Sequence, residues 1–206
     1  DAAAEAIGDI LPVRVECEAL GWRAAPSAYA VQLMGMEGWL VAMATRPDLV
    51  RRFHDFIRDD IAAYMDWLES QALLTLNNAN HYVGAGSYGF TSELPRSESA
   101  RAGGRVMLAD LWLNMNSQET VGISPAMYAE LVFPAYEALA RKGGLVYYGC
   151  CEPVHAIWDR CISRLANLRK VSVSAWCDER FIGERLRGGR VIYSRKPSPN
   201  FIGAAA

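Results

Sequence analysis

The chain has 206 residues, of which 51% are hydrophobic and 21% are charged, and its formal net charge at pH 7 is −2. This composition is typical of a soluble globular domain with a substantial core, and it argues against intrinsic disorder. Lysine and arginine are scattered along a nearly neutral chain, so neither nucleic acid nor a membrane surface is an expected partner. No apolar run approaches the roughly 20 residues of a membrane span, and the opening DAAAEAIGDI lacks the regions of a signal peptide. We therefore expect a cytoplasmic protein.

The first half of the chain predicts two strands separated by helices. Residues 10–16 (ILPVRVE) are a short apolar run typical of a buried strand. Ser27 is expected to cap a helix, and a second, long helix should cover residues 48–71, where apolar residues recur at spacings of three and four. His54 lies beside this apolar stripe and is expected at the surface or half-buried. Residues 73–78 (LLTLNN) are the second strand candidate.

The middle of the chain predicts one strand and one helix after a loop rich in glycine and serine. The strand lies within residues 108–119. The helix begins at Ser124 and Pro125, a capping residue followed by a proline in the first turn, and ends before the Gly143–Gly144 pair. Pro134 inside this helix predicts a kink.

The last third of the chain alternates strands with single helices. Strands are expected at residues 145–150, 170–175 and 190–194, and helices at 153–165 and 178–187. Because parallel strands need a crossover that is usually helical, this order predicts an α/β fold with a parallel sheet. No glycine-rich phosphate-binding motif follows the first strand, so a dinucleotide-binding fold is disfavoured.

A (β/α)8 TIM barrel fits the strand and helix order best, in one domain that spans residues 1–206. A complete barrel needs eight strands and about 250 residues, whereas the patterns account for about six strands. The first residue is Asp1 rather than methionine, and the last three are alanines. The expectation is therefore a barrel truncated at both ends.

Polar and thiol side chains follow the predicted strands, where the active sites of such barrels are built. The opposite strand ends carry mainly turn formers and solvated charges. The candidates are Asn78, Asn80, His81, Gln118, Glu119, Cys151, Glu152, His155, Trp176, Cys177, Asp178, Arg195 and Lys196.

The stretch YYGCCEPVHAIWD, residues 147–159, concentrates metal-binding residue types at the end of a strand. A thiol near the following helix N-terminus would be favoured as a thiolate, which is both a metal ligand and a nucleophile. Zinc takes cysteine, histidine and glutamate ligands, so three of Cys150, Glu152, His155 and Cys177 could hold one. The alternative is that these cysteines are small buried apolar residues, as we expect for Cys161. The five cysteines lack the spacing of a disulfide framework, which indicates reduced thiols.

Several segments resemble the uroporphyrinogen decarboxylase (URO-D) superfamily, in particular a branch of uroporphyrinogen decarboxylase-like proteins. They are LTLNNANHYVGAGS, VYYGCCEPVH, NLRKVSVSAWCD and YSRKPSPNF, and the likeness extends from ILPVRVE to SPNF. The resemblance implies a (β/α)8 barrel and one of two chemistries. One is decarboxylation of a tetrapyrrole's acetate side chains without metal or cofactor, although the arginine-rich N-terminal signature of that reaction has no counterpart here.

The other chemistry is methyl transfer between a methylated corrinoid, carried by a partner protein, and a thiol activated by zinc. Cys150 matches the cysteine of the His-x-Cys pair that holds this zinc, whereas Tyr148 stands in place of the histidine. We put methyl transfer first, decarboxylation of a uroporphyrinogen-like tetrapyrrole second, and a noncatalytic subunit that binds a tetrapyrrole or a corrinoid protein third. The state of assembly is open, with a homodimer as one alternative.

Each candidate residue has an expected role and a structural alternative. Asn78 and His81 would otherwise serve turn chemistry, Gln118 and Glu119 a capped turn, and Trp176 core packing. Lys196 would otherwise be solvated. The expected roles are zinc binding by Cys150, His155 and Cys177; catalysis by Glu119, Glu152 and His155; and substrate binding by Asn78, His81, Gln118, Trp176 and Lys196.

Overall fold

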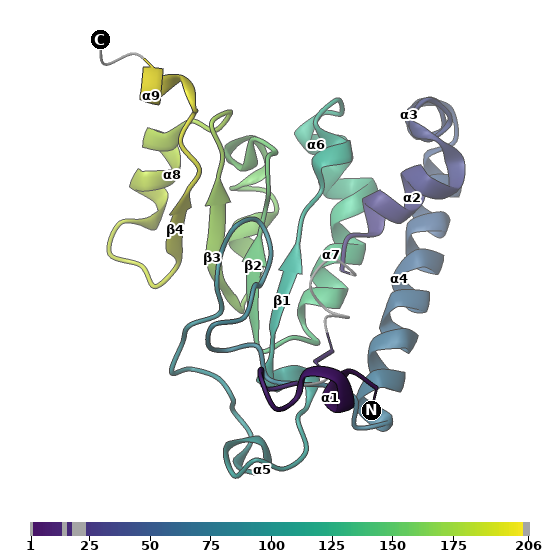
Figure 1. Ribbon diagram of the computed structural model, residues 1–206. Coiled ribbons are helices and arrows are strands. Elements are labelled where there is room, and N and C mark those ends of the chain that lie inside the picture. The colour runs from purple at the N-terminus through teal and green to yellow at the C-terminus, as the bar shows by residue number, and fades with distance from the viewer. Residues whose placement is uncertain (1, 14–15, 18–23, 204–206) are drawn as a thin grey trace.

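A four-stranded parallel sheet forms the centre of the computed structural model, which describes residues 2–13, 16–17 and 24–203 (Figure 1). Its strands lie side by side in chain order, with Trp112 opposite Leu145, Tyr147 opposite Lys170 and Ser172 opposite Ser194. The strands are β1 (Trp112–Met115), β2 (Leu145–Tyr148), β3 (Leu168–Val173) and β4 (Ile192–Arg195).

Helices precede the sheet and connect its strands. The α-helices are α1 (Ala2–Ile7), α2 (Pro26–Met34), α3 (Met36–Thr45), α4 (Pro47–Ser70), α5 (Glu98–Arg101), α6 (Pro125–Met127), α7 (Phe133–Ala140), α8 (Glu179–Leu186) and α9 (Asn200–Gly203). Short 3-10 turns are η1 (Leu108–Asp110), η2 (Gln118–Thr120), η4 (Val154–Ile157) and η5 (Ile162–Arg164), and η3 (Tyr128–Val132) is a π-helical turn. None of the described helices is long and apolar enough to cross a membrane.

The predicted α/β class with parallel pairing is confirmed, but the predicted barrel of about six strands is wrong. The described residues form one open sheet of four short strands. Around the expected first strand, residues 10–13 and 16 are not in a strand, while Arg14 and Val15 lie outside the described residues. Residues 73–78 form no ladder with β1, and the side chain of Asn77 instead bonds both backbone polar groups of Trp112.

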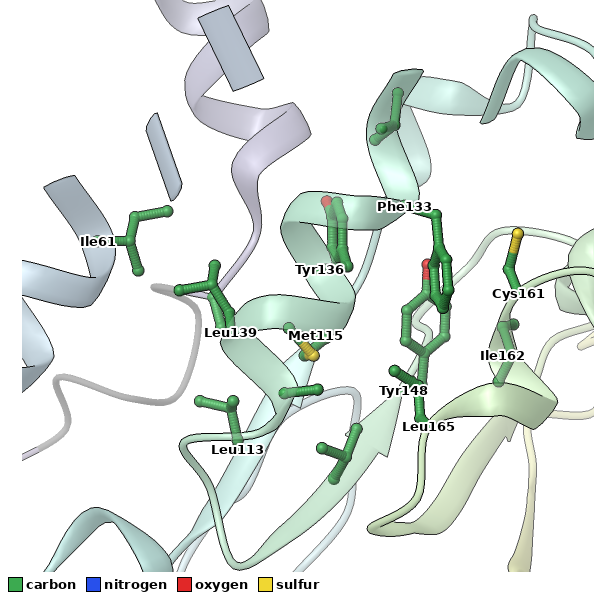
Figure 2. Close-up of a cluster of buried hydrophobic side chains, with 14 of the residues drawn as sticks. Ile61, Leu113, Met115, Phe133, Tyr136, Leu139, Tyr148, Cys161, Ile162 and Leu165 are labelled. Carbon is green, nitrogen blue, oxygen red and sulfur yellow. The ribbon is translucent and has the colours of Figure 1, made fainter. Parts of the chain in front are cut away.

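The sheet has two faces with different coverings. The helix face packs Leu113, Met115, Val146 and Tyr148 into the main core with α4, η3 and α7. Figure 2 shows Met115 and Tyr148 of this face beside aromatic and aliphatic side chains of the helices. We call the opposite face the loop face, because the connection between α4 and β1 passes over it (Figure 1). Its apolar contacts are Val83, Ala85, Leu94, Trp112, Leu145 and Tyr147.

The long helix α4 is amphipathic, as its periodic pattern predicts, but Leu49, Phe56 and Tyr64 of the predicted apolar stripe are exposed. Its buried residues are Val50, His54, Ile57, Ile61, Met65 and Leu68, and they fall on one face because a helix repeats every 3.6 residues. His54 was expected at the surface or half-buried, but it is 1% exposed. Its Nε2 accepts a hydrogen bond from Trp39 Nε1 at 3.2 Å, which compensates in part for its burial.

Two capping predictions have opposite outcomes. Ser124 caps its helix as expected, with Oγ accepting from the N–H of Met127. Ser27 caps nothing: its hydroxyl donates instead to Glu119 Oε2 at 2.8 Å. A kink was predicted at Pro134, and the structure has the π-helical turn η3 just before α7, in which Pro134 is the second residue. Proline favours such a local change because it lacks an N–H and its ring collides with the carbonyl four residues back.

Candidate functional site

The carboxyl ends of the four strands meet at one edge of the sheet, since all of the strands are parallel. The side chains predicted from the sequence to act there fall into three groups by position. The first group is buried between the strand ends, the second lies in surface loops, and the third lies on the loop face.

Glu152 belongs to the first group and joins the ends of β1 and β2. Its Oε1 accepts from the N–H of Ser117 at 2.8 Å, and its Oε2 accepts from the N–H of Cys150 at 2.9 Å. The side chain is 4% exposed, and burial raises the pKa of its carboxyl group. This predicted catalytic residue therefore holds two loops together, and substrate has little access to it.

The hydroxyl groups next to Glu152 extend into the helix face. Tyr148 shares hydrogen bonds with Ser117 at 2.8 Å and with Tyr128 at 2.6 Å. Glu119 is half-buried and reaches Ser27, whose hydroxyl also bonds the hydroxyl of Tyr136 at 2.6 Å. The sheet thus separates Glu119 from the loop face, and its neighbour Gln118 in η2 points to solvent.

The segment after Glu152 is not the predicted helix over residues 153–165. Two 3-10 turns, η4 and η5, replace it, and they pack Trp158, Cys161, Ile162 and Leu165 into the main core. The burial of Cys161 confirms its assignment as a core residue. His155 lies in η4, where its Nδ1 accepts from the N–H of Asp178 at 3.1 Å.

Trp176 and Cys177 follow β3 at the same edge. Trp176 is 74% exposed, so the core-packing alternative for it is wrong, and its indole is free to meet a ligand. Cys177 is half-buried, with Sγ 3.7 Å from the carbonyl oxygen of Glu152 and 3.5 Å from Ser174 Oγ.

The predicted zinc ligands do not converge into one donor set. In the part of the chain that the structure describes, no group of three or more His, Cys, Asp or Glu side chains is arranged to hold a metal ion. Burial, followed by the neighbouring thiol of Cys151, raises the pKa of Cys150 to about 12, which favours the protonated thiol over the thiolate. The donor set as it stands does not fit a tetrahedral zinc, and zinc binding remains a prediction.

Asn78 and His81 support the connection over the loop face. Asn78 Nδ2 donates to the carbonyl oxygen of Leu94 at 2.8 Å, and His81 Nδ1 accepts from the N–H of Ala79 at 3.3 Å. His81 Nε2 also lies 3.8 Å from a carboxylate oxygen of Glu16. Both residues therefore have the turn-forming contacts that were the alternative to substrate binding.

Lys196 stands out among the predicted residues, because it lies on the loop face beside the hydroxyl groups of Tyr147 and Ser194. Its Nζ donates to Tyr147 Oη at 3.1 Å and to Ser194 Oγ at 2.7 Å. It also lies 5.8 Å from the centre of the Tyr147 ring. Lys196 is half-buried and close enough to Cys150 to favour the thiolate of that residue, although burial of the thiol prevails.

Lys170, from β3, is a second ammonium group on this face and is 5% exposed. Its Nζ donates to Ser87 Oγ at 3.0 Å and to the carbonyl oxygen of Tyr88 at 2.7 Å. It also lies 4.9 Å from the centre of the Trp112 ring and 5.4 Å from that of Tyr147. Burial, followed by the charge of Lys196, lowers the pKa of Lys170.

Tyr147, Lys170 and Lys196 together form what we call the lysine–tyrosine cluster. Among the described residues, neither lysine forms an ion pair with a carboxylate. Their positive charges are met by hydroxyl and carbonyl oxygens and by aromatic rings. This arrangement creates a positive potential on the loop face that an anionic ligand would neutralise.

Asn114 is the polar residue of β1 on the loop face, opposite Tyr147. It is 2% exposed, and its Oδ1 has no hydrogen-bond partner. Gly84 lies against this amide so closely that a Cβ there would be 2.4 Å from Asn114 Cγ. A buried acceptor without a donor is costly, so Asn114 Oδ1 is a polar group of the loop face whose hydrogen-bonding capacity the fold leaves unsatisfied.

Sequence reasoning found Lys196 but missed Tyr147, Lys170 and Asn114. One signal was present, because Lys170 interrupts a buried strand in which its neighbours at alternate positions are apolar or small. The pairing of Lys170 with Lys196 depends on strand register, which the sequence did not reveal.

The fold and this site define the class: an α/β protein with an open parallel sheet and a cationic, hydroxyl-rich cluster on its loop face. Comparisons of the chain with protein-family models, with functionally characterised proteins and with solved structures find no match. The site's own geometry therefore carries the functional argument.

Proposed function

We propose that the protein is an enzyme that binds a carboxylate-bearing small molecule at the lysine–tyrosine cluster and removes a carboxyl group without a metal. This is the decarboxylase branch of the chemistry implied by the resemblance to the URO-D superfamily. The observation that carries the proposal is the presence of two neighbouring ammonium groups, Lys170 and Lys196, without a carboxylate partner among the described residues.

Lys196 is the residue best placed to meet the substrate. It is half-buried, whereas Lys170 is enclosed by the connection and bound to Ser87 and Tyr88. Lys196 would hold a substrate carboxylate by a charge-assisted hydrogen bond, and Lys170 would add positive potential from beneath. The Tyr147 hydroxyl donates to the carbonyl oxygen of Ala85 at 3.2 Å, so it orients Lys196 by accepting from its ammonium group.

The chemistry needs charge stabilisation at one carbon. In decarboxylation the bond between the substrate carbon and its carboxyl group breaks, the electron pair stays on that carbon, and carbon dioxide leaves. A proton from solvent or from an ammonium group then replaces the lost carboxyl group. Fixed cations in a site of low dielectric stabilise the negative charge that develops in the transition state. The cluster supplies such cations.

The test uses uroporphyrinogen as the substrate probe and tricarballylate as a binding probe. Wild-type protein should release carbon dioxide from uroporphyrinogen and bind tricarballylate. Lys196→Met should weaken tricarballylate binding at least tenfold, and Lys142→Met, which removes a lysine of the opposite side, should leave it unchanged. Binding without turnover would favour the noncatalytic subunit, and absence of both binding and turnover in folded protein would overturn the proposal.

Methyl transfer from a corrinoid is the second candidate, and one observation favours it. Glu152 contacts cysteines of two strand ends, since its side chain accepts from the N–H of Cys150 and its carbonyl oxygen lies 3.7 Å from Cys177 Sγ. Metal analysis of wild type beside Cys150→Ser tests this candidate. About one zinc per chain, lost in the variant, would establish a thiolate site and require a rearranged donor set. Absence of zinc from both samples would remove it.

A further inference from the structure

Two adjacent thiols, those of Cys150 and Cys151, approach each other at the carboxyl end of β2. Their Sγ atoms are 3.7 Å apart. Cys151 is exposed, whereas Cys150 is half-buried and packs against the apolar residues of the loop face. The two sulfur atoms are therefore in contact.

We propose that Cys150 and Cys151 are a modification site, a vicinal dithiol that closes reversibly to a disulfide by exchange with a small-molecule disulfide such as oxidised glutathione. The reaction itself is independent of the proposed decarboxylase function. It shares Cys150 with the predicted zinc ligands Cys150, His155 and Cys177, but it needs no metal.

The exchange proceeds in two steps that balance in atoms and electrons. The thiolate of Cys151 first attacks one sulfur of oxidised glutathione, which forms a mixed disulfide and releases one glutathione thiolate. Cys150, after losing its proton to solvent, then attacks Cys151 Sγ and expels the second glutathione thiolate. Two electrons pass from the protein to the glutathione disulfide, and the two protons end on the two reduced glutathione molecules.

The order of these steps follows from exposure. Cys151 is exposed and is the thiol that a small-molecule disulfide reaches, so it reacts first, whereas Cys150 is half-buried. Once the mixed disulfide has formed, Cys150 Sγ lies in contact with Cys151 Sγ, and such proximity favours the second step.

The disulfide would be easily reduced, which makes the modification reversible. Adjacent Cα atoms are about 3.8 Å apart, whereas unstrained disulfides join Cα atoms separated by roughly 4.4 to 6.8 Å. Strain raises the reduction potential, and exposed, strained disulfides are the labile ones.

Formation of the Cys150–Cys151 disulfide would affect the neighbouring strand ends. The N–H of Cys150 donates to Glu152 Oε2, and its carbonyl oxygen accepts from Ser172 Oγ at 2.8 Å. The Cys150 carbonyl belongs to the peptide between the two cysteines, so twisting that peptide would shift its hydrogen bond with Ser172. Because Lys196 lies close to Cys150, disulfide formation would change the surroundings of Lys196 and so ligand binding at the lysine–tyrosine cluster. This consequence rests on the proposed function.

The experiment equilibrates folded wild-type protein with graded mixtures of reduced and oxidised glutathione, blocks the remaining thiols and determines the intact mass. Oxidised protein should be lighter by two hydrogens before blocking, should carry two fewer blocking groups, and should yield one peptide that contains both linked cysteines. Dithiothreitol should restore the original mass. This measurement needs no variant.

Variants then separate the two steps. Cys150→Ser should stop at the mixed disulfide on Cys151, and Cys151→Ser should form neither product. Cys177→Ser, which changes a half-buried cysteine of the adjacent loop, should behave as wild type. Persistence of the intramolecular disulfide in Cys151→Ser, a stable mixed disulfide in wild type, or no reaction at all would each overturn the proposal, whatever the result with uroporphyrinogen.

Discussion

The side chain of Asn77 pairs with both backbone polar groups of Trp112: its Nδ2 donates to the Trp112 carbonyl oxygen at 2.9 Å, and its Oδ1 accepts from the Trp112 N–H at 2.8 Å. An amide side chain thus takes the place that a neighbouring strand would occupy at the edge of β1. It satisfies the backbone groups of a residue that is 1% exposed.

Asn77→Ala should destabilise the protein by about 2 kcal/mol, because it leaves two buried backbone groups of Trp112 without partners. Urea denaturation followed by tryptophan fluorescence measures the change. Asn80→Ala, at an exposed position of the same connection, should change the free energy of unfolding by less than about 0.5 kcal/mol. Equal stabilities of the two variants would contradict a structural role for Asn77.

His54 should make the protein sensitive to acid. Burial lowers its pKa from 6.5 to about 4, so the folded state binds the proton less readily than the unfolded state does. Its contribution to stability is therefore present above pH 6.5 and is lost as the pH falls from 6.5 toward 4, by roughly 3 kcal/mol in total.

The comparison with His54→Gln isolates this effect, because glutamine can still accept from Trp39 Nε1 but does not titrate in this range. Between pH 7 and pH 4, wild type should lose roughly 3 kcal/mol more than the variant in the free energy of unfolding. Parallel pH profiles of the two proteins would refute the assignment.

Glu152→Gln should destabilise the protein by about 1 to 3 kcal/mol, because a glutamine offers one oxygen where two N–H groups need acceptors. The exposed Glu37→Gln is the matched control, and thermal unfolding at pH 7 is the measurement. The raised pKa of Glu152 has its own pH signature. The stabilisation that comes from this raised pKa is fully present below the pKa of Glu152 in the unfolded state. It is lost as the pH rises through the pKa of the folded state, which is the opposite pH dependence to that of His54. A variant as stable as wild type would show that Glu152 does not hold the two loops.

Lys170→Met should loosen the connection from the loop face. The ammonium group of Lys170 bonds Ser87 Oγ and the Tyr88 carbonyl, and hydrogen bonds of a charged group are worth about 1.5 to 3 kcal/mol. Amide hydrogen exchange of Val83, Ser87 and Gly89 should accelerate by about tenfold or more. Exchange at these three amides should not respond to Lys142→Met, and an unchanged rate in Lys170→Met would mean that other contacts hold the connection.

Local sequence patterns predicted some features of the candidate site, but not those that depend on long-range contacts. The sequence placed Lys196 and Glu152 at strand ends, because a strand end can be recognised from a few neighbouring residues. It did not show that Glu152 would be enclosed or that Glu119 would lie on the helix face beside Ser27. These outcomes depend on contacts across 35 and 92 residues of chain, which no local pattern encodes.

The sequence by itself determined the α/β class, the four strands of the sheet and the amphipathic character of α4, because alternation and helical periodicity are properties of adjacent residues. Only the tertiary structure decided that the described residues form an open sheet, in which the side chain of Asn77 bonds the backbone of Trp112 at the edge of β1. It also decided the lysine–tyrosine cluster, because strand register and the path of the connection bring Tyr147, Lys170 and Lys196 together. Register is set by packing among distant segments, and a shift by one residue would have turned these side chains to the other face.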